Sequence, residues 1–429
     1  MKINWKKIIV TVGLGISLLG CIGCKEKNVE EKENQNTLKI CTQTIYVDNM
    51  KKLIETWEHF NKGLKAELIV IPKDPDEAEI KISEIRTEML AGGGPDVFLM
   101  NDRRCFGFST WEEEGMPMLF QNPEKAMYSG TFLPLDSYIK NAKYFNPEHY
   151  NPVIMEAGKT EEGQCLLPIA YDYRISYFEE PQENPIQMPL PSWESLVSGE
   201  AGLTSTMFPA INYSFPDLLG EYVDYENKKL LLSEKELYQY VLDSIDFGIF
   251  AENGRETAGM DLVWTEGDFA ECFIGNSREY KQNPNSLLAN PNREGGINAN
   301  ITTWAGINKN TKRPTQAFSL LDLLLSDEVM TREGFSEAGK YAGSSIAFGL
   351  DGILTHQEAF ENDCKYLPDD TEKAFKALNS QINSVRFSSD FDKELQKMRD
   401  ACREAAGNEE EQRKIVKETY EKIELMLAE

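Results

Sequence analysis

Short apolar runs and amphipathic segments alternate along the chain from residue 38 onward. Residues 38–41, 68–71 and 97–100 are apolar runs of strand length, and the second run predicts a strand buried on both faces. Two segments between them carry apolar side chains at helical spacing, namely Met50, Leu53, Ile54, Trp57 and Phe60, then Ile82, Ile85, Met89 and Leu90. This order of elements predicts a parallel sheet covered by helices.

Glycine, proline and polar caps mark the ends of several predicted helices. Three glycines and Pro95 end the second helix at residues 92–95. Ser233 and Glu236 predict a capping box, ahead of a stripe of Leu237, Val241 and Ile245. Residues 304–307 predict a short strand, and Pro314 predicts the start of a helix. The C-terminal helix has its apolar stripe at Val416, Tyr420, Ile423 and Leu427.

The N-terminal segment has the pattern of an export signal. Three lysines precede an apolar run at residues 8–19, which is shorter than the roughly 20 residues of a membrane-spanning helix and fits a signal peptide. The run ends in Leu18-Leu19-Gly20-Cys21, which resembles the lipobox of bacterial lipoproteins. We expect a signal peptide at residues 1–20, then an acylated N-terminus and polar tether at residues 21–37. There are two alternatives: Cys24 is the acylated residue, or the protein is secreted without modification.

The composition of the chain and the spacing of its reactive residues argue against several classes of function. The net charge of −26 argues against a nucleic-acid-binding surface. The eight cysteines are scattered without zinc-type spacing, and the three histidines lie far apart in the sequence. No metalloprotease motif, nucleophile elbow or phosphate-binding loop occurs. The 71 acidic residues leave one enzymatic alternative open, a glycosidase with a pair of catalytic carboxylates. We expect no catalytic residue, no metal and no cofactor.

Five stretches resemble, in the same order, the extracellular solute-binding proteins of the maltose-binding type. They are residues 87–102, 132–136 (which precede a long helix in that family), 163–173, 191–194 and 304–310. The resemblance implies an α/β fold of the type II periplasmic-binding-protein kind, with two α/β lobes joined by a hinge that the chain crosses three times. The implied crossings are near residues 168–173, 303–307 and 343–349. The first lobe would comprise residues 38–170 and 304–348, and the second 171–303 and 349–429.

The same resemblance implies a binding protein that delivers a carbohydrate to the permease subunits of an ABC importer. The chain departs from the family at residues 177–180 and 264–273, so a peptide or small charged solute stays open as the ligand. A surface-anchored glycosidase or an adhesin is a further alternative. We expect a monomer, held to the outer face of the cell membrane through Cys21, with no nucleic-acid partner.

Sugar sites combine aromatic surface with a few placed hydrogen-bonding groups. Residues of these kinds near predicted strand ends and hinge crossings are therefore the candidate ligand contacts. They are Tyr46, Asn101, Asp102, Trp111, Tyr171, Asp172, Trp264, Glu266, Trp304 and Tyr341. For each aromatic residue, packing in the core or hinge is the alternative. For Asn101 and Asp102, the alternative is a turn or a helix cap.

Overall fold

The computed structural model describes residues 37–101, 117–178, 193–197, 215–258, 264–268, 287–289, 291–332, 352–365 and 369–429. Met1–Thr37 and Leu38–Glu429 are two separate units, and every described residue except Thr37 belongs to the second. None of the helices in the described ranges is both long enough and apolar enough to cross a membrane.

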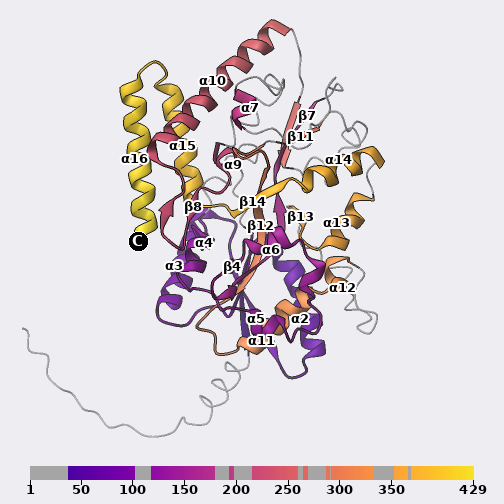
Figure 1. Ribbon diagram of the computed structural model, residues 1–429. Helices are drawn as coiled ribbons and strands as arrows, with labels where there is room; N and C mark the ends of the chain where they lie inside the picture. The colour runs from indigo at the N-terminus through magenta and orange to yellow at the C-terminus, as the bar shows by residue number, and fades with distance from the viewer. Residues whose placement is uncertain are drawn as a thin grey trace, which may run out of the picture. The chain divides into compact units, whose positions relative to one another are not determined.

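A seven-stranded sheet forms the centre of this unit (Figure 1). Its strands are β1 (Thr37–Gln43), β2 (Lys65–Ile71), β3 (Val97–Asn101), β6 (Leu166–Asp172), β12 (Ile297–Ile307), β13 (Ile353–Leu354) and β14 (Ile382–Phe387). The order is β13-β6-β12-β3-β1-β2, and β14 pairs with the first half of β12.

The prediction of a parallel sheet is correct only for part of it. β1 and β3 pair in parallel, as expected. β12, which arrives from far along the sequence, runs antiparallel to both β3 and β6. The sheet is therefore mixed. The strand predicted at residues 304–307 is the end of the eleven-residue β12.

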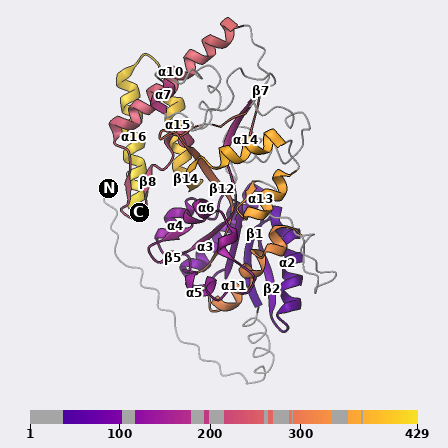
Figure 2. The same ribbon diagram turned by 45° about the vertical axis from the view of Figure 1, so that its right-hand side comes forward.

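Helices cover both faces of the sheet. α2 (Val47–Phe60) and α11 (Pro314–Leu324) pack against each other, and Figure 2 shows α2 beside β1 and β2. Consecutive residues of β3 face opposite sides: Val97 and Leu99 join the core beneath α2 and α11, and Phe98 and Met100 join the core on the other face.

Two sequence predictions about burial are wrong. Residues 68–71 lie in β2, which is an edge strand, and of these four only Ile71 is fully buried. Leu90 is the last residue of α3 (Pro75–Leu90) and is 90 % exposed. It lies about 100° around the helix from Met89, which does pack against the core. The predicted helix end is confirmed, since Gly92 adopts a φ of +79°.

A separate helical core lies around the chain's last two helices. α10 (Glu234–Ala258), α15 (Asp390–Glu404) and α16 (Glu409–Ala428) pack against one another, together with α7 (Trp193–Val197) and α9 (Phe215–Leu219). The predicted capping box is confirmed: Ser233 N donates to Glu236 Oε2 over 2.8 Å, and Glu236 N donates to Ser233 Oγ over 3.3 Å. We call the part of the molecule built around this core the helical part.

The chain leaves the large sheet at Tyr173. β6 ends at Asp172, and β7 (Arg174–Phe178) already belongs to a three-stranded sheet with β10 (Trp264–Asp268) and β11 (Leu287–Ala289). This exit falls within the predicted first crossing. β13 and β14, from the range expected in the second lobe, belong to the large sheet. The lobe boundaries stay a prediction, and residues 343–349 lie outside the described ranges.

Shorter elements connect these parts. They are η1 (Thr44–Tyr46), α4 (Pro123–Tyr128), α5 (Asp136–Ile139), η2 (Pro147–His149), α6 (Pro152–Glu156), β4 (Lys159–Thr160), β5 (Gly163–Gln164), β8 (Val223–Asp224), β9 (Lys229–Leu230), α12 (Asp327–Met330), α13 (Gln357–Cys364) and α14 (Asp369–Asn379). The long helix implied after residues 132–136 is wrong, because α5 has only four residues.

Candidate functional site

A polar network lies where β1 and β3 end, at their carboxyl ends. Asn101 Nδ2 donates to the Tyr46 hydroxyl over 3.1 Å, and that hydroxyl lies 2.5 Å from Thr303 Oγ1 on β12. The Gln43 side chain exchanges two 2.7 Å hydrogen bonds with the backbone of Asn101. The structure thus brings two predicted site residues, Tyr46 and Asn101, together. It adds Gln43 and Thr303, which the sequence analysis did not include among the candidate contacts.

Tyr171 and Asp172 lie where the chain leaves the large sheet. Tyr171 is 1 % exposed, and its hydroxyl donates to Asn379 Oδ1 over 2.7 Å. Burial raises the pKa of the Tyr171 hydroxyl, so it stays a neutral donor. Asp172 is also buried, and its Oδ1 accepts from Tyr173 N over 2.8 Å. Both residues therefore reach a ligand only if the covering elements move apart.

Trp304 is packed in the core. It is 1 % exposed, and its ring lies 5.6 Å from each of the rings of Phe120 and Phe132 and 6.1 Å from the ring of Phe387. Within the described part of the chain, its indole N–H has no hydrogen-bond acceptor. The hydroxyl of Thr302, two residues earlier on β12, is also buried without a hydrogen-bond partner among the described residues.

The remaining predicted contacts are less fully described. Trp264 and Glu266 lie on β10, opposite Phe178 and Ser176 of β7, and only their backbone is described. Asp102, Trp111 and Tyr341 lie outside the described residues.

A buried charge cluster was not foreseen from the sequence. Arg386 on β14 pairs with Asp217 over 2.6 Å and with Asp392. Asn298 and Asn300 of β12 also donate to Asp217, over 3.1 and 2.9 Å, and the Tyr222 hydroxyl donates to Asp392 over 2.8 Å. Asp392 lies six residues after Arg386, but Asp217 lies 169 residues before it, so the sequence gives no local pattern for the whole cluster. Its buried groups hold β12, β14, α9 and α15 together.

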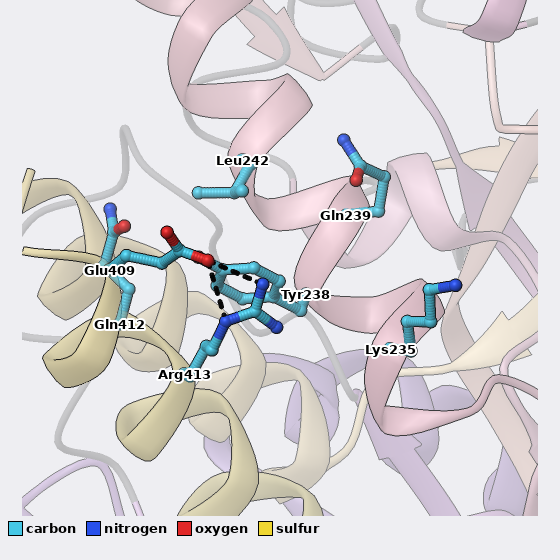
Figure 3. A pocket seen from close by; sticks show the side chains of 7 residues that line it. All are labelled: Lys235, Tyr238, Gln239, Leu242, Glu409, Gln412 and Arg413. Atoms are coloured by element: carbon cyan, nitrogen blue, oxygen red, sulfur yellow. Dashed lines mark hydrogen bonds and ion pairs between the residues drawn. The ribbon is translucent and has the colours of Figure 1, made fainter. Parts of the chain in front are cut away.

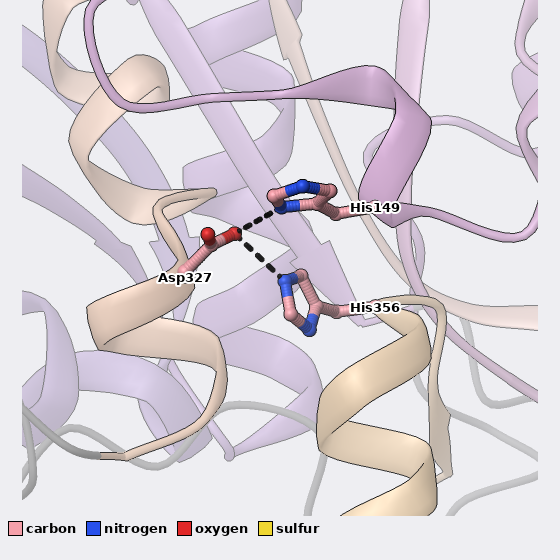
Figure 4. Close-up of side chains that lie close together, drawn as sticks. All are labelled: His149, Asp327 and His356. Atoms are coloured by element: carbon pink, nitrogen blue, oxygen red, sulfur yellow. Dashed lines mark hydrogen bonds and ion pairs between the residues drawn. The ribbon is translucent and has the colours of Figure 1, made fainter.

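His149, Asp327 and His356 form a group close enough to share a metal ion (Figure 4). Asp327 Oδ1 lies 2.8 Å from His149 Nδ1 and 2.9 Å from His356 Nε2. The other ring nitrogens both accept, His149 Nε2 from Asn146 Nδ2 and His356 Nδ1 from Ala359 N. Each ring therefore carries its proton on the nitrogen facing Asp327, where a metal would need a lone pair. The group fits a structural tie better than a metal site.

A surface groove of about 360 Å³ lies between α10 and α16 (Figure 3). Arg413 covers the Tyr238 ring at 4.4 Å and makes two hydrogen bonds to Glu409, of 3.0 and 2.7 Å. The aromatic face that a sugar could stack on is thus already occupied by a guanidinium group. The groove lies on the helical part, whereas Tyr46 and Asn101 lie at the edge of the large sheet.

Taken together, the mixed sheet with its helices and the polar strand ends define an α/β fold of the type II periplasmic-binding-protein class. No family model matches the sequence, and no curated protein matches it. Solved structures do match over almost the whole chain.

Three of these structures show the likeness. An extracellular solute-binding protein of family 1 from Alicyclobacillus acidocaldarius matches with a TM-score of 0.53 and 14 % identity, over 92 % of this chain and 98 % of that one. A periplasmic oligogalacturonide-binding protein from Yersinia enterocolitica gives 0.56 and 14 %, over 91 % and 99 %. The sugar-binding protein MalE from Xanthomonas citri gives 0.55 and 12 %, over 91 % and 97 %. At such low identity the likeness establishes the fold.

Proposed function

We propose that this chain is an exported, lipid-anchored substrate-binding protein that captures a carbohydrate and delivers it to an ABC importer without altering it. The observation that carries the proposal is the fold, shared over about nine-tenths of the chain with proteins described as binding sugars. In open α/β folds, ligands bind outside the carboxyl ends of the strands. The Tyr46–Asn101 network lies at the corresponding edge of β1 and β3.

The unsatisfied donors in the core support a ligand contact near β12. A buried donor without a partner costs about 1–3 kcal/mol. The indole N–H of Trp304 has no acceptor among the described residues, and sugar hydroxyls are good acceptors. A sugar that entered between the covering elements would satisfy this donor. We accordingly keep Trp304, Tyr171 and Asp172 as proposed contacts, together with Trp264, Glu266, Asp102, Trp111 and Tyr341.

A thermal-shift screen of the protein lacking residues 1–24 tests the ligand class. A sugar at 100 times its dissociation constant stabilises the folded state by about 2.7 kcal/mol. Stabilisation by one family of sugars, with the sugar recovered unchanged, supports the proposal. If only peptides or charged solutes stabilise the protein, the ligand is not a carbohydrate. If the protein converts the sugar chemically, and mutation of one carboxylate abolishes the conversion, the protein is an enzyme.

Expression of Cys21→Ala in the native host tests the anchor. Two acyl chains on Cys21 would give stable membrane attachment. The variant is expected in the medium or as an unprocessed precursor, whereas Cys24→Ala is expected on the membrane. If the Cys21→Ala protein stays membrane-bound at its mature mass, the lipid anchor is attached to another residue.

A further inference from the structure

β1 leaves the large sheet before its neighbour β3 ends. The backbone of β1 pairs with β3 as far as Thr42, which lies opposite Leu99. After Gln43 the chain turns into η1 and continues into α2. The backbone groups of Asn101, the last residue of β3, therefore lie beyond the paired part of β1. Backbone N–H and C=O groups within a fold require hydrogen-bond partners, so another group has to serve Asn101 on this side.

The side chain of Gln43 takes the place of the missing backbone. Gln43 Nε2 donates to Asn101 O over 2.7 Å, and Asn101 N donates to Gln43 Oε1 over 2.7 Å. A hydrogen-bonded residue pair in an antiparallel ladder exchanges the same two bonds. Glutamine suits this role because its amide carries a donor and an acceptor on one group. The pairing of β3 thus continues to its last residue.

The other side of Asn101 faces β12. Asn101 lies opposite Thr303 in the antiparallel register, and both its backbone N–H and its C=O bond to Gln43. Asn101 and Thr303 therefore form a non-hydrogen-bonded pair, the kind in which side chains lie closest together. Both side chains reach the Tyr46 hydroxyl, at 3.1 and 2.5 Å. The place of the Asn101 side chain thus depends on where Gln43 holds its backbone.

Exposure separates the members of this network. Tyr46 and Thr303 are 1 % and 0 % exposed, whereas Gln43 and Asn101 are half-buried. Asn101 stands at the carboxyl end of β3, where ligands bind in open α/β folds. Its side-chain amide is therefore the polar group of the network best placed for a sugar hydroxyl. The Gln43 amide is engaged with the Asn101 backbone, so it affects a sugar through Asn101.

We propose that Gln43 is a positioning residue of the sugar site. Its two hydrogen bonds fix the backbone of Asn101 and thereby set the direction in which the Asn101 amide meets a sugar hydroxyl. Hydrogen bonds weaken steeply when donor and acceptor are misaligned, so loosening the end of β3 lowers the affinity for the sugar. This inference rests on the proposed function.

Sugar affinity and stability, measured on the same full-length Gln43→Met protein, test this role. Methionine is close to glutamine in length but forms neither hydrogen bond with Asn101. The probe is the sugar that gives the largest thermal shift in the screen, and titration calorimetry gives its affinity. The affinity is expected to fall by about tenfold, the order of magnitude of one lost hydrogen bond. Affinity equal to that of the wild type would overturn the proposal.

Gln164→Met is the matched control. Gln164 is also a buried glutamine whose Nε2 donates to backbone carbonyl oxygens, over 3.0 and 2.6 Å. β3 and β6 both run antiparallel to β12, so the start of β6, beside Gln164, lies at the edge of the sheet opposite to the end of β3. This variant should lose stability and keep its sugar affinity. Equal losses of affinity at Gln43 and Gln164 would show a general effect on the fold and contradict the positioning role.

Gln43→Glu adds a rescue experiment. A carboxylate accepts from Asn101 N but cannot donate to Asn101 O, whereas the protonated acid does both. With the ordinary glutamate pKa of about 4.3, lowering the pH from 7.5 to 5 should raise the affinity of this variant, relative to the wild type at each pH, by about twofold or more. The same ratio for Gln43→Met should stay constant. A constant ratio for Gln43→Glu would count against the proposal.

Hydrogen exchange distinguishes a failure of this role from a failure of the proposed function. If no sugar stabilises the wild-type protein, the carbohydrate function is wrong. The amide of Asn101 reports on Gln43 in either case, because it donates to Gln43 Oε1. After correction for intrinsic exchange, it should exchange about tenfold faster in Gln43→Met than in the wild type. Unchanged exchange would show that Gln43 does not hold the end of β3.

Discussion

At the scale of single residues, Arg386 shows how burial turns an ion pair into a structural requirement. Its side chain is 6 % exposed and faces the carboxylates of Asp217 and Asp392, which are 8 % and 0 % exposed. Removing one partner of a buried pair leaves an uncompensated charge, which costs far more than the intact pair contributes.

Arg386→Leu is therefore expected to destabilise the ligand-free protein by about 3–5 kcal/mol, because two buried carboxylates lose their counter-ion. Urea unfolding followed by tryptophan fluorescence measures this change. Arg413→Leu is the matched control, since Arg413 is 57 % exposed and its pair with Glu409 should contribute about 1 kcal/mol or less. Similar losses for the two variants would show that the Arg386 cluster is not the buried tie described.

Trp304→Ala tests core packing against ligand contact. Its ring fills a site among Phe120, Phe132 and Phe387, so truncation should cost about 3–5 kcal/mol of unfolding free energy in the absence of ligand. Denaturant unfolding without sugar gives this number directly. A variant of normal stability that has lost sugar affinity would instead make Trp304 chiefly a ligand contact.

At the scale of elements, the three-residue cluster of His149, Asp327 and His356 links η2, α12 and the start of α13. The carboxylate accepts from both rings, and His356 Nδ1 caps α13 by accepting from Ala359 N over 3.2 Å. Burial alone would raise the pKa of Asp327, but the hydrogen bonds from His149 and His356 outweigh it and hold the pKa below its ordinary 3.8.

Asp327→Asn should therefore destabilise the protein at pH 6–7 and matter progressively less in acid. A carboxylate whose pKa is lowered by folding stabilises the protein at pH values above its ordinary pKa. This stabilisation is lost as the pH falls through the pKa that the carboxylate has in the folded state. Because Asp327 keeps 41 % of its side chain exposed, the expected loss is about 1 kcal/mol or less. Unfolding curves at pH 7 and pH 3 check this. Asp48→Asn is the control, because the Asp48 side chain is 92 % exposed. Its effect on the free energy of unfolding should be the same at pH 7 and pH 3.

Local pattern predicts the elements well where one face is buried. The stripe of α2, the capping box of α10 and the proline at the start of α11 are all confirmed. Periodicity did not predict the edge position of β2 or the length of α5, because pairing partners and neighbouring segments set both.

At the scale of the whole molecule, the proposed binding function requires two parts that close around a ligand. Ligand favours a closed form only as far as it contacts both parts at once. Small-angle X-ray scattering with and without the sugar identified by screening should show a smaller radius of gyration in the bound state. Unchanged scattering at saturating sugar would argue against hinge closure.

Trp264→Ala tests the contribution of the small sheet to that site. If Trp264 stacks on a sugar, the variant should lose about 2 kcal/mol of binding free energy, roughly thirtyfold in affinity, while its ligand-free stability stays near wild type. Titration calorimetry beside urea unfolding separates the outcomes. Normal affinity, or a loss of stability near 3–5 kcal/mol, would remove Trp264 from the site.

From the chain alone came several of the longer helices and strands, because short-range periodicity and caps specify them, and the resemblance to solute-binding proteins implied the fold class. The sequence also predicted Tyr46 and Asn101 as polar groups at strand ends, and the fold brings them within hydrogen-bonding distance of each other. Three features depend on long-range pairing. β12 runs antiparallel to β3, and Gln43 and Thr303 join the network of Tyr46 and Asn101. Arg386 pairs with Asp217, which lies 169 residues away in the sequence. Such contacts depend on how distant segments pack, and no local spacing in the sequence encodes them.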